Sequence, residues 1–160
     1  MSPATVEVLR SLLAGERLLS LAVVAEGEPI AGLLPFVWTA DGGALLVQAS
    51  GLARHSRGLA PGAPFDAVVH AADDGSRDPL QVPRVTLQGR VRRLERDTPE
   101  FVAAARAFVE RFPSAAQTLA LSDFQLHRLE VETARLVAGF ARAVDVTGQD
   151  LREAAAGGRT

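Results

Sequence analysis

Residues 84–93 read RVTLQGRVRR and, as far as Arg92, alternate between polar side chains and apolar or small ones. The polar positions are Arg84, Thr86, Gln88, Arg90 and Arg92. Because successive side chains of a β-strand point to opposite faces, this pattern predicts a strand with one buried and one polar face. The polar face has two interpretations, the solvent side of a sheet or a row of hydrogen-bonding groups beside a polar ligand.

The segments on either side of this stretch also have the character of strands. Upstream, apolar runs of strand length alternate with turn signals, EGEP at 26–29 and DGG at 41–43. Pro35 lies inside one of these runs and has no N–H to donate, so we expect an edge or a bulge there. The predicted strands span 18–25, 30–38, 44–48, 65–71 and 124–131, and residues 134–144 supply one or two more around Gly139.

Helical signals surround these strands. Apolar residues at helical spacing predict an amphipathic helix over 5–14. Thr98, Pro99 and Glu100 form a typical helix start and predict a helix that ends near residue 112, followed by a shorter one over 114–121. Ser50 is expected to cap another short helix within 50–60.

Together these elements predict an α+β fold of about six or seven antiparallel strands with inserted helices. A closed barrel is favoured, because closure removes the exposed edges of a sheet. A length of 160 residues suits one domain. We expect this domain to occupy 1–146 and the small, polar residues of 147–160 to form a flexible tail.

The composition excludes several kinds of chemistry. Cysteine is absent, which excludes disulfides, thiolate catalysis and cysteine-bound metal centres. All 17 basic residues are arginine, so Schiff-base chemistry on lysine is excluded, and tyrosine is absent as well. A net charge of -2 does not indicate nucleic acid or an anionic membrane as a partner. No apolar run approaches the roughly 18 residues of a membrane helix and no signal peptide is evident, so we expect a cytoplasmic protein.

The densest group of polar residues is SGLARHSR at 50–57, between a predicted strand and a predicted helix. Backbone amides at a helix start favour an anion, Arg54 offers a guanidinium fork and His55 can donate from its ring. The segment indicates a phosphate site, with a solvated basic helix face as the alternative. On the strand at 84–93, Gln88 can donate and accept hydrogen bonds, which suits the rim of a flavin or pterin.

The remaining histidines indicate less. His70 precedes Asp73 and Asp74, but three ligands on a tight turn are not expected to converge on a metal. His127 lies in an alternating strand beside Arg128 and is interpreted as a surface or interface residue. No dinucleotide-binding, P-loop, nucleophile-elbow or zinc-protease motif is present, and no catalytic residue is assigned.

Five segments, in this order, resemble one known superfamily. They are AGLLPF at 31–36, LARHSRGL at 52–59, PRVTLQG at 83–89, DFQLHRL at 123–129 and RLVAGFARA at 135–143. The first three resemble the pyridoxamine 5′-phosphate oxidase-related, FMN-binding split-barrel superfamily, and the last two resemble its branch of heme-utilisation proteins. The resemblance implies a split β-barrel and a homodimer with FMN bound at the subunit interface.

The resemblance also implies roles for single residues. The superfamily's phosphate-binding Arg-Lys pair falls on Arg54 and His55, and the serine before that pair falls on Ala53, so two phosphate contacts differ here. Leu34 and Pro35 fall on the strand edge that faces the flavin ring. With the residues singled out above, the expected cofactor-binding set is Leu34, Pro35, Ser50, Arg54, His55, Arg84 and Gln88.

Three functions are consistent with these observations. The first is an FMN-dependent oxidoreductase acting on a small, unidentified substrate. The second is a heme-binding or heme-degrading protein, with His55, His70 or His127 as the axial ligand. The third is a non-catalytic dimeric binding module that has lost tight cofactor binding. Oxidation of vitamin B6 is not expected, because the C-terminal segment that grips that substrate in true pyridoxamine phosphate oxidases has no counterpart after Val144.

Overall fold

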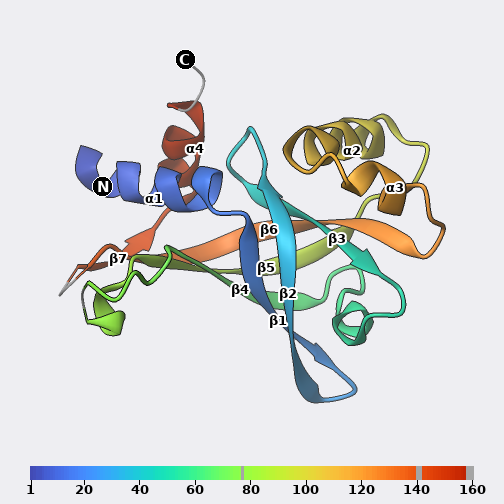
Figure 1. Cartoon of the computed structure of the whole chain (residues 1–160), viewed down its shortest axis with the longest axis horizontal. Helices are drawn as coiled ribbons and strands as arrows, with labels where there is room; N and C mark the ends of the chain where they lie inside the picture. Colours follow the sequence, from blue (N-terminus) through green and yellow to red (C-terminus); the bar gives the residue numbers. More distant parts are fainter. Residues whose placement is uncertain (77, 140–141, 158–160) are drawn as a thin grey trace.

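The computed structural model of the chain describes residues 1–76, 78–139 and 142–157 (Figure 1). Within these residues, seven antiparallel strands form one sheet in the order β3-β2-β1-β4-β5-β6-β7. A further pairing of β3 with β6 closes six of them into a barrel and leaves β7 attached to β6. The expected α+β barrel with inserted helices is therefore confirmed.

The elements follow the chain in a simple order. The strands are β1 (Leu18–Ala25), β2 (Glu28–Trp38), β3 (Ala44–Ser50), β4 (Pro64–His70), β5 (Arg84–Arg93), β6 (Phe124–Val137) and β7 (Ala143–Val146). The helices are α1 (Pro3–Arg10), α2 (Pro99–Arg111), α3 (Ala115–Leu119) and α4 (Gly148–Ala156). A π-helical turn (Ser11–Gly15) extends α1, and short 3-10 helices lie at Arg54–Gly58 and Pro79–Gln81.

Strand β5 has the predicted alternation. Val85, Leu87 and Val91 are buried in the barrel, whereas Gln88 and Arg90 are exposed on its outer surface. The pairing of β5 with β6 is irregular between Gln88 and Gly89. A Cβ at Gly89 would lie 1.8 Å from the carbonyl oxygen of Glu130, so this close backbone approach requires glycine.

Pro35 lies in β2, which is bordered by β1 on one side and β3 on the other. The N–H of Phe36 donates to the carbonyl of Arg17 on the β1 side. The neighbouring nitrogen of Pro35 therefore faces the β3 side, where pairing begins only with Phe36 and Val47. Pro35 is at a local edge of the sheet, and its missing N–H breaks no ladder bond.

Two apolar cores hold the structure together. One fills the barrel, and the other lies outside it, where α2 and α3 cover β3 and β6. The second core is centred on Phe108, which is fully buried, with Leu46, Phe112 and Leu126 around it. Because both faces of β3 are covered, this strand is apolar at almost every position rather than at alternate ones.

The C-terminal segment differs from the expected flexible tail, because 148–156 form helix α4 beside α1 (Figure 1). Thr147 accepts a hydrogen bond from the N–H of Asp150, whose carboxylate accepts one from the N–H of Thr147. This reciprocal capping box starts the helix, and Leu151 and Ala154 are buried. Residues 158–160 of the expected tail lie outside the described part of the chain.

The end of the barrel also differs from expectation. The predicted separate strands over 124–131 and 134–144 are largely one long strand, β6, which runs to Val137. Residues 140–141 of the second predicted strand lie outside the described residues, and β7 follows them. None of the described helices combines the length and the apolar character needed to cross a membrane.

Candidate functional site

Two adjoining grooves lie on the outer surface of the barrel. The helix groove has a volume of about 650 Å³ and is lined by residues that include Leu18, Pro35, Gln48, Phe112 and Thr118. The strand groove has a volume of about 420 Å³ and is lined by residues that include Leu18, Ser20, Leu33 and His70. Arg17 and Leu18 line both grooves, so the two grooves meet where β1 begins.

The apolar floor of the strand groove follows from strand alternation. Leu19 and Leu34 point into the barrel and are almost fully buried, which turns their neighbours Leu18 and Leu33 outward. Leu18 is 49% exposed and Leu33 is 65% exposed. These two exposed leucines make part of the surface of the strand groove apolar.

A cation and an amide mark the helix groove. The guanidinium carbon of Arg17 lies 5.0 Å from the centre of the Phe112 ring, a cation–π arrangement that holds the charge where the grooves meet. Gln48 is buried, and its amide nitrogen donates to the hydroxyl of Thr118 at 2.6 Å. The groove is therefore apolar, with a few fixed polar groups, as small-molecule sites usually are.

His70 ends β4 and lines the strand groove. Its Nδ1 lies 2.8 Å from the carbonyl oxygen of Ala71. A carbonyl only accepts hydrogen bonds, so Nδ1 carries the proton, and in the neutral ring Nε2 carries a free lone pair. Metal-ligating histidines usually hold their other ring nitrogen in this way. Arg84, the first residue of β5, is the cross-strand partner of His70 on β4, and its guanidinium donates to the carbonyls of Leu80 and Val82.

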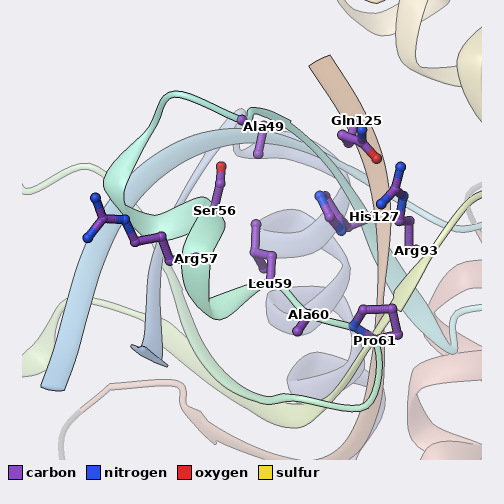
Figure 2. A pocket seen from close by; sticks show the side chains of 10 residues that line it. Ala49, Ser56, Arg57, Leu59, Ala60, Pro61, Arg93, Gln125 and His127 are labelled. Carbon is purple, nitrogen blue, oxygen red and sulfur yellow. The ribbon is translucent and has the colours of Figure 1, made fainter. Parts of the chain in front are cut away.

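A third cavity, of about 400 Å³, lies at one end of the barrel beside the 3-10 helix Arg54–Gly58 (Figure 2). We call it the barrel mouth; residues that line it include Ala49, Leu59, Pro61, Arg93, Gln125 and His127. His127 is only 5% exposed, so its interpretation as a surface residue is wrong. Burial lowers the pKa of His127 to about 4, and the charges of Arg93 and His55 act in the same direction.

The predicted phosphate segment is only partly available to a ligand. Arg54 is exposed, but the ring of His55 lies against β2, where a Cβ on Gly32 would be 2.7 Å from its Nδ1. The Nε2 atom of His55 is buried without a hydrogen-bond partner, and burial lowers the pKa of this ring. His55 therefore does not present a cation beside Arg54.

Ser50 does not cap a helix, contrary to prediction. The 3-10 helix starts after Ala53 without a side-chain cap. The Ser50 hydroxyl instead donates to the Asp123 carboxylate at 2.9 Å and accepts from the N–H of Leu52. This arrangement joins β3 to the start of β6.

The remaining predicted residues lie on different surfaces. Leu34 points into the barrel core and is 3% exposed, whereas Pro35 lines the helix groove. Gln88 is on the outer face of β5, where its amide nitrogen donates to Asp66 at 2.6 Å. Gln88 lines a separate groove on this outer face, and Arg54 and Arg84 line none of the three cavities described above. One copy of the chain does not assemble the predicted set into one site.

Sequence reasoning missed Arg17, Leu33, Gln48 and Thr118. The outward positions of the runs at 18–25 and 30–38 carry a signal that could have identified Leu33, because a solvated strand face would be polar there. No local pattern brings Gln48 to Thr118, since the two are 70 residues apart in the chain. Asp73 and Asp74 accept hydrogen bonds from the backbone of Gly75 and Ser76, and no cluster of metal-ligating side chains occurs among the described residues.

Comparison with known proteins identifies the family. The CREG β-barrel family model matches residues 53–152. HutZ of Vibrio cholerae, named a heme oxygenase, is 31% identical over 135 residues, which are 83% of this chain and 76% of HutZ. HutZ is also described as the heme storage protein of V. cholerae. Its crystal structure matches with a TM-score of 0.69 at 26% identity, over 78% of this chain and 87% of the HutZ chain.

Two mycobacterial structures extend the comparison. A heme-binding protein from Mycobacterium smegmatis has a TM-score of 0.81 at 30% identity over 96% of this chain, which spans only 62% of that protein. An FAD- and heme-binding protein from the same organism has a TM-score of 0.58 at 20% identity over 92% of this chain and 75% of its own, a likeness of fold alone. The resemblance to split-barrel proteins of the heme-utilisation branch is confirmed, and the chain belongs to the CREG β-barrel family.

Proposed function

We propose that this protein binds heme on the outer surface of its barrel, with His70 as the iron ligand. The observation that carries the proposal is the His70 ring, whose Nδ1 is held by a carbonyl and which lies beside exposed Leu18 and Leu33. The similarity to HutZ and to the heme-binding protein of M. smegmatis supports heme as the bound molecule.

The groove residues fit the chemical requirements of heme. A porphyrin is a flat apolar plate with two carboxylates at one edge, so it needs apolar walls, cations and an axial ligand. Leu18 and Leu33 supply apolar surface, and Arg17 supplies a cation where the two grooves meet. Arg84, the cross-strand neighbour of His70, is a second cation near the strand groove, although it does not line the groove and its guanidinium donates to the carbonyls of Leu80 and Val82. Bound heme would supply the redox chemistry of its iron, while these residues orient it and exclude water.

FMN fits this chain less well. A phosphate is usually held by several charged or amide donors, and here Ala53 lacks a hydroxyl and His55 is turned against Gly32. Exposed Arg54 is the observation that favours FMN, so an FMN-dependent oxidoreductase acting on a small molecule is the second candidate function. A binding module without either cofactor is the third.

The outer face of the barrel also supports a homodimer. Leu33 and Val24 are more than half exposed, at 65% and 54%, and the neighbouring outward residues Ala22 and Ala31 are small. An exposed apolar sheet face of this kind suits a second copy of the same chain, which would cover the strand groove and enclose a ligand. Val24→Glu should shift the protein to monomer in sedimentation analysis, and an unchanged mass would overturn this arrangement.

A hemin titration followed through the Soret band tests the main proposal. Wild type should give a saturable spectrum of histidine-ligated heme. His70→Gly should lose that spectrum and bind hemin at least tenfold more weakly, and added imidazole should restore it by filling the space of the ring. If His70→Gly gives the wild-type spectrum, His70 is not the ligand. If wild type binds no hemin, heme binding itself is refuted.

A parallel FMN titration separates the second candidate from the third. FMN fluorescence should be quenched on binding. Arg54→Ala should weaken the binding of FMN by about 1.5–3 kcal/mol and leave the binding of riboflavin almost unaffected. Equal losses for both ligands would show that Arg54 does not hold the phosphate. A protein that binds neither hemin nor FMN would belong to the third class.

A further inference from the structure

The barrel mouth has one polar wall and one apolar wall. Figure 2 shows Arg93, Gln125 and His127 together on one side of the cavity, with Leu59 on the other. Ala49 and Pro61 add further apolar surface to the lining. None of these residues lines either outer groove, so the mouth is separate from the proposed heme site.

The polar wall is built around His127. The residue is 95% removed from solvent, and its Nδ1 is buried without a hydrogen-bond partner. Nε2 is therefore the ring atom that can serve a ligand in the cavity. A proton on Nδ1 would remain an unpaired buried donor, whereas a proton on Nε2 can be paired by an acceptor in the mouth. A ligand that offers a hydrogen-bond acceptor to Nε2–H is thus the best partner for the His127 ring.

The neighbouring side chains reinforce this preference. Arg93 contributes a permanent positive charge, and its nearest carboxylate, Glu95, is 3.9 Å from Nε, too far for a hydrogen bond. Gln125 has no side-chain hydrogen bond among the described residues, so its amide N–H groups remain available. Arg57 also lines the cavity, but Figure 2 shows its guanidinium directed away from the centre. The mouth therefore gathers three side chains that can donate, and no carboxylate is among the described residues that line it.

The apolar wall limits the identity of the ligand. A phosphate needs donors on most sides, whereas Leu59 and Pro61 give the lining of this cavity hydrocarbon as well. A carboxylate on a short apolar body satisfies both walls, and about 400 Å³ is within the size range of small-molecule sites. We propose that the barrel mouth binds a small apolar carboxylic acid, with its carboxylate on Arg93, Gln125 and His127 and its hydrocarbon against Leu59 and Pro61.

Binding can be observed at the His127 ring itself. The full-length protein, labelled with 15N at histidine, is titrated with butyrate and benzoate and, as neutral controls of the same shape, with butyramide and benzamide. Inorganic phosphate serves as an anion without an apolar body. We expect saturable shifts of the His127 ring nitrogens with the two carboxylates and at least tenfold weaker binding of the amides and of phosphate.

Variants of two arginines of β5 test whether Arg93 supplies the positive charge that binds the carboxylate. Arg93→Gln should weaken the binding of benzoate at least tenfold, and Arg93→Lys should retain part of the affinity for benzoate. Arg90→Gln, which removes an outward-facing arginine of β5, should leave benzoate binding unchanged. Equal affinity for benzoate and benzamide would overturn the proposal, as would the absence of a saturable shift in wild type. Phosphate that binds as tightly as benzoate would show a general anion site instead.

Discussion

Acidification should destabilise this protein through His127. Burial, with help from Arg93 and His55, holds the pKa of this ring at about 4, compared with 6.5 for an unrestrained histidine. Between these two values the unfolded chain binds a proton that the folded protein excludes. The free energy of unfolding therefore falls as the pH falls from about 6.5 toward about 4 and is little affected by this ring above pH 7.

The expected loss follows from the difference between the two pKa values. Because one pKa unit corresponds to about 1.4 kcal/mol, the complete loss from His127 is about 3 kcal/mol. About 2 kcal/mol of it should be lost between pH 7 and pH 5. This is a large share of the 5–15 kcal/mol that is typical of a folded domain, so the effect should be easy to measure.

Urea unfolding of wild type and His127→Gln at several pH values measures this loss. The difference between the two proteins removes the contribution of carboxylates such as Asp41 and Asp150, whose lowered pKa values cost stability only at more acidic pH. Wild type should lose about 2 kcal/mol more than the variant from pH 7 to pH 5. Parallel losses in the two proteins, or an NMR midpoint for His127 near 6.5, would refute the reasoning.

Other substitutions test the packing. Gly89→Ala should cost at least about 1–3 kcal/mol in urea unfolding, because its Cβ would overlap a backbone carbonyl, whereas Gly15→Ala, with open space around it, should be nearly neutral. Thr147→Ala should cost about 1 kcal/mol by removing the α4 cap, and an unchanged thermal midpoint would show that the cap is dispensable. Phe108→Ala should cost about 3–5 kcal/mol as the centre of the second core, and a calorimetric loss below about 1 kcal/mol would contradict that position.

The barrel could be predicted because its strongest signals are local. The alternation in β5 predicts which face of the strand is buried, and the turn signals before β2 and β3 predict where those strands begin. Helix α2 was recognised by Thr98, whose hydroxyl accepts from the N–H of Phe101. Helix α4 was missed because composition outweighed pattern: 147–160 is small and polar, but Thr147 and Asp150 form a capping box ahead of buried Leu151.

The candidate sites could be predicted only in part, because they depend on contacts between distant segments. The sequence identifies Arg54 and His55 as one polar pair, but in the fold the His55 ring packs against Gly32 and its Nε2 is buried, whereas Arg54 stays exposed. Likewise, an alternating strand indicates which residues share a face with His127, but not that this face points into a closed barrel beside the cavity at its mouth. Closure is a property of the β3–β6 pairing.

The three histidines show how the fold separates residues of one type. His70 has a held Nδ1 and a free Nε2, which suits a metal. His127 has a buried, unpartnered Nδ1, so a metal on Nε2 would leave an unpaired buried N–H, whereas an acceptor on Nε2–H would not. His55 has its unpartnered Nε2 buried and has no comparable opening. For this reason the heme test depends on His70 and the carboxylate test on His127, and a loss in one assay that leaves the other intact would distinguish the two sites.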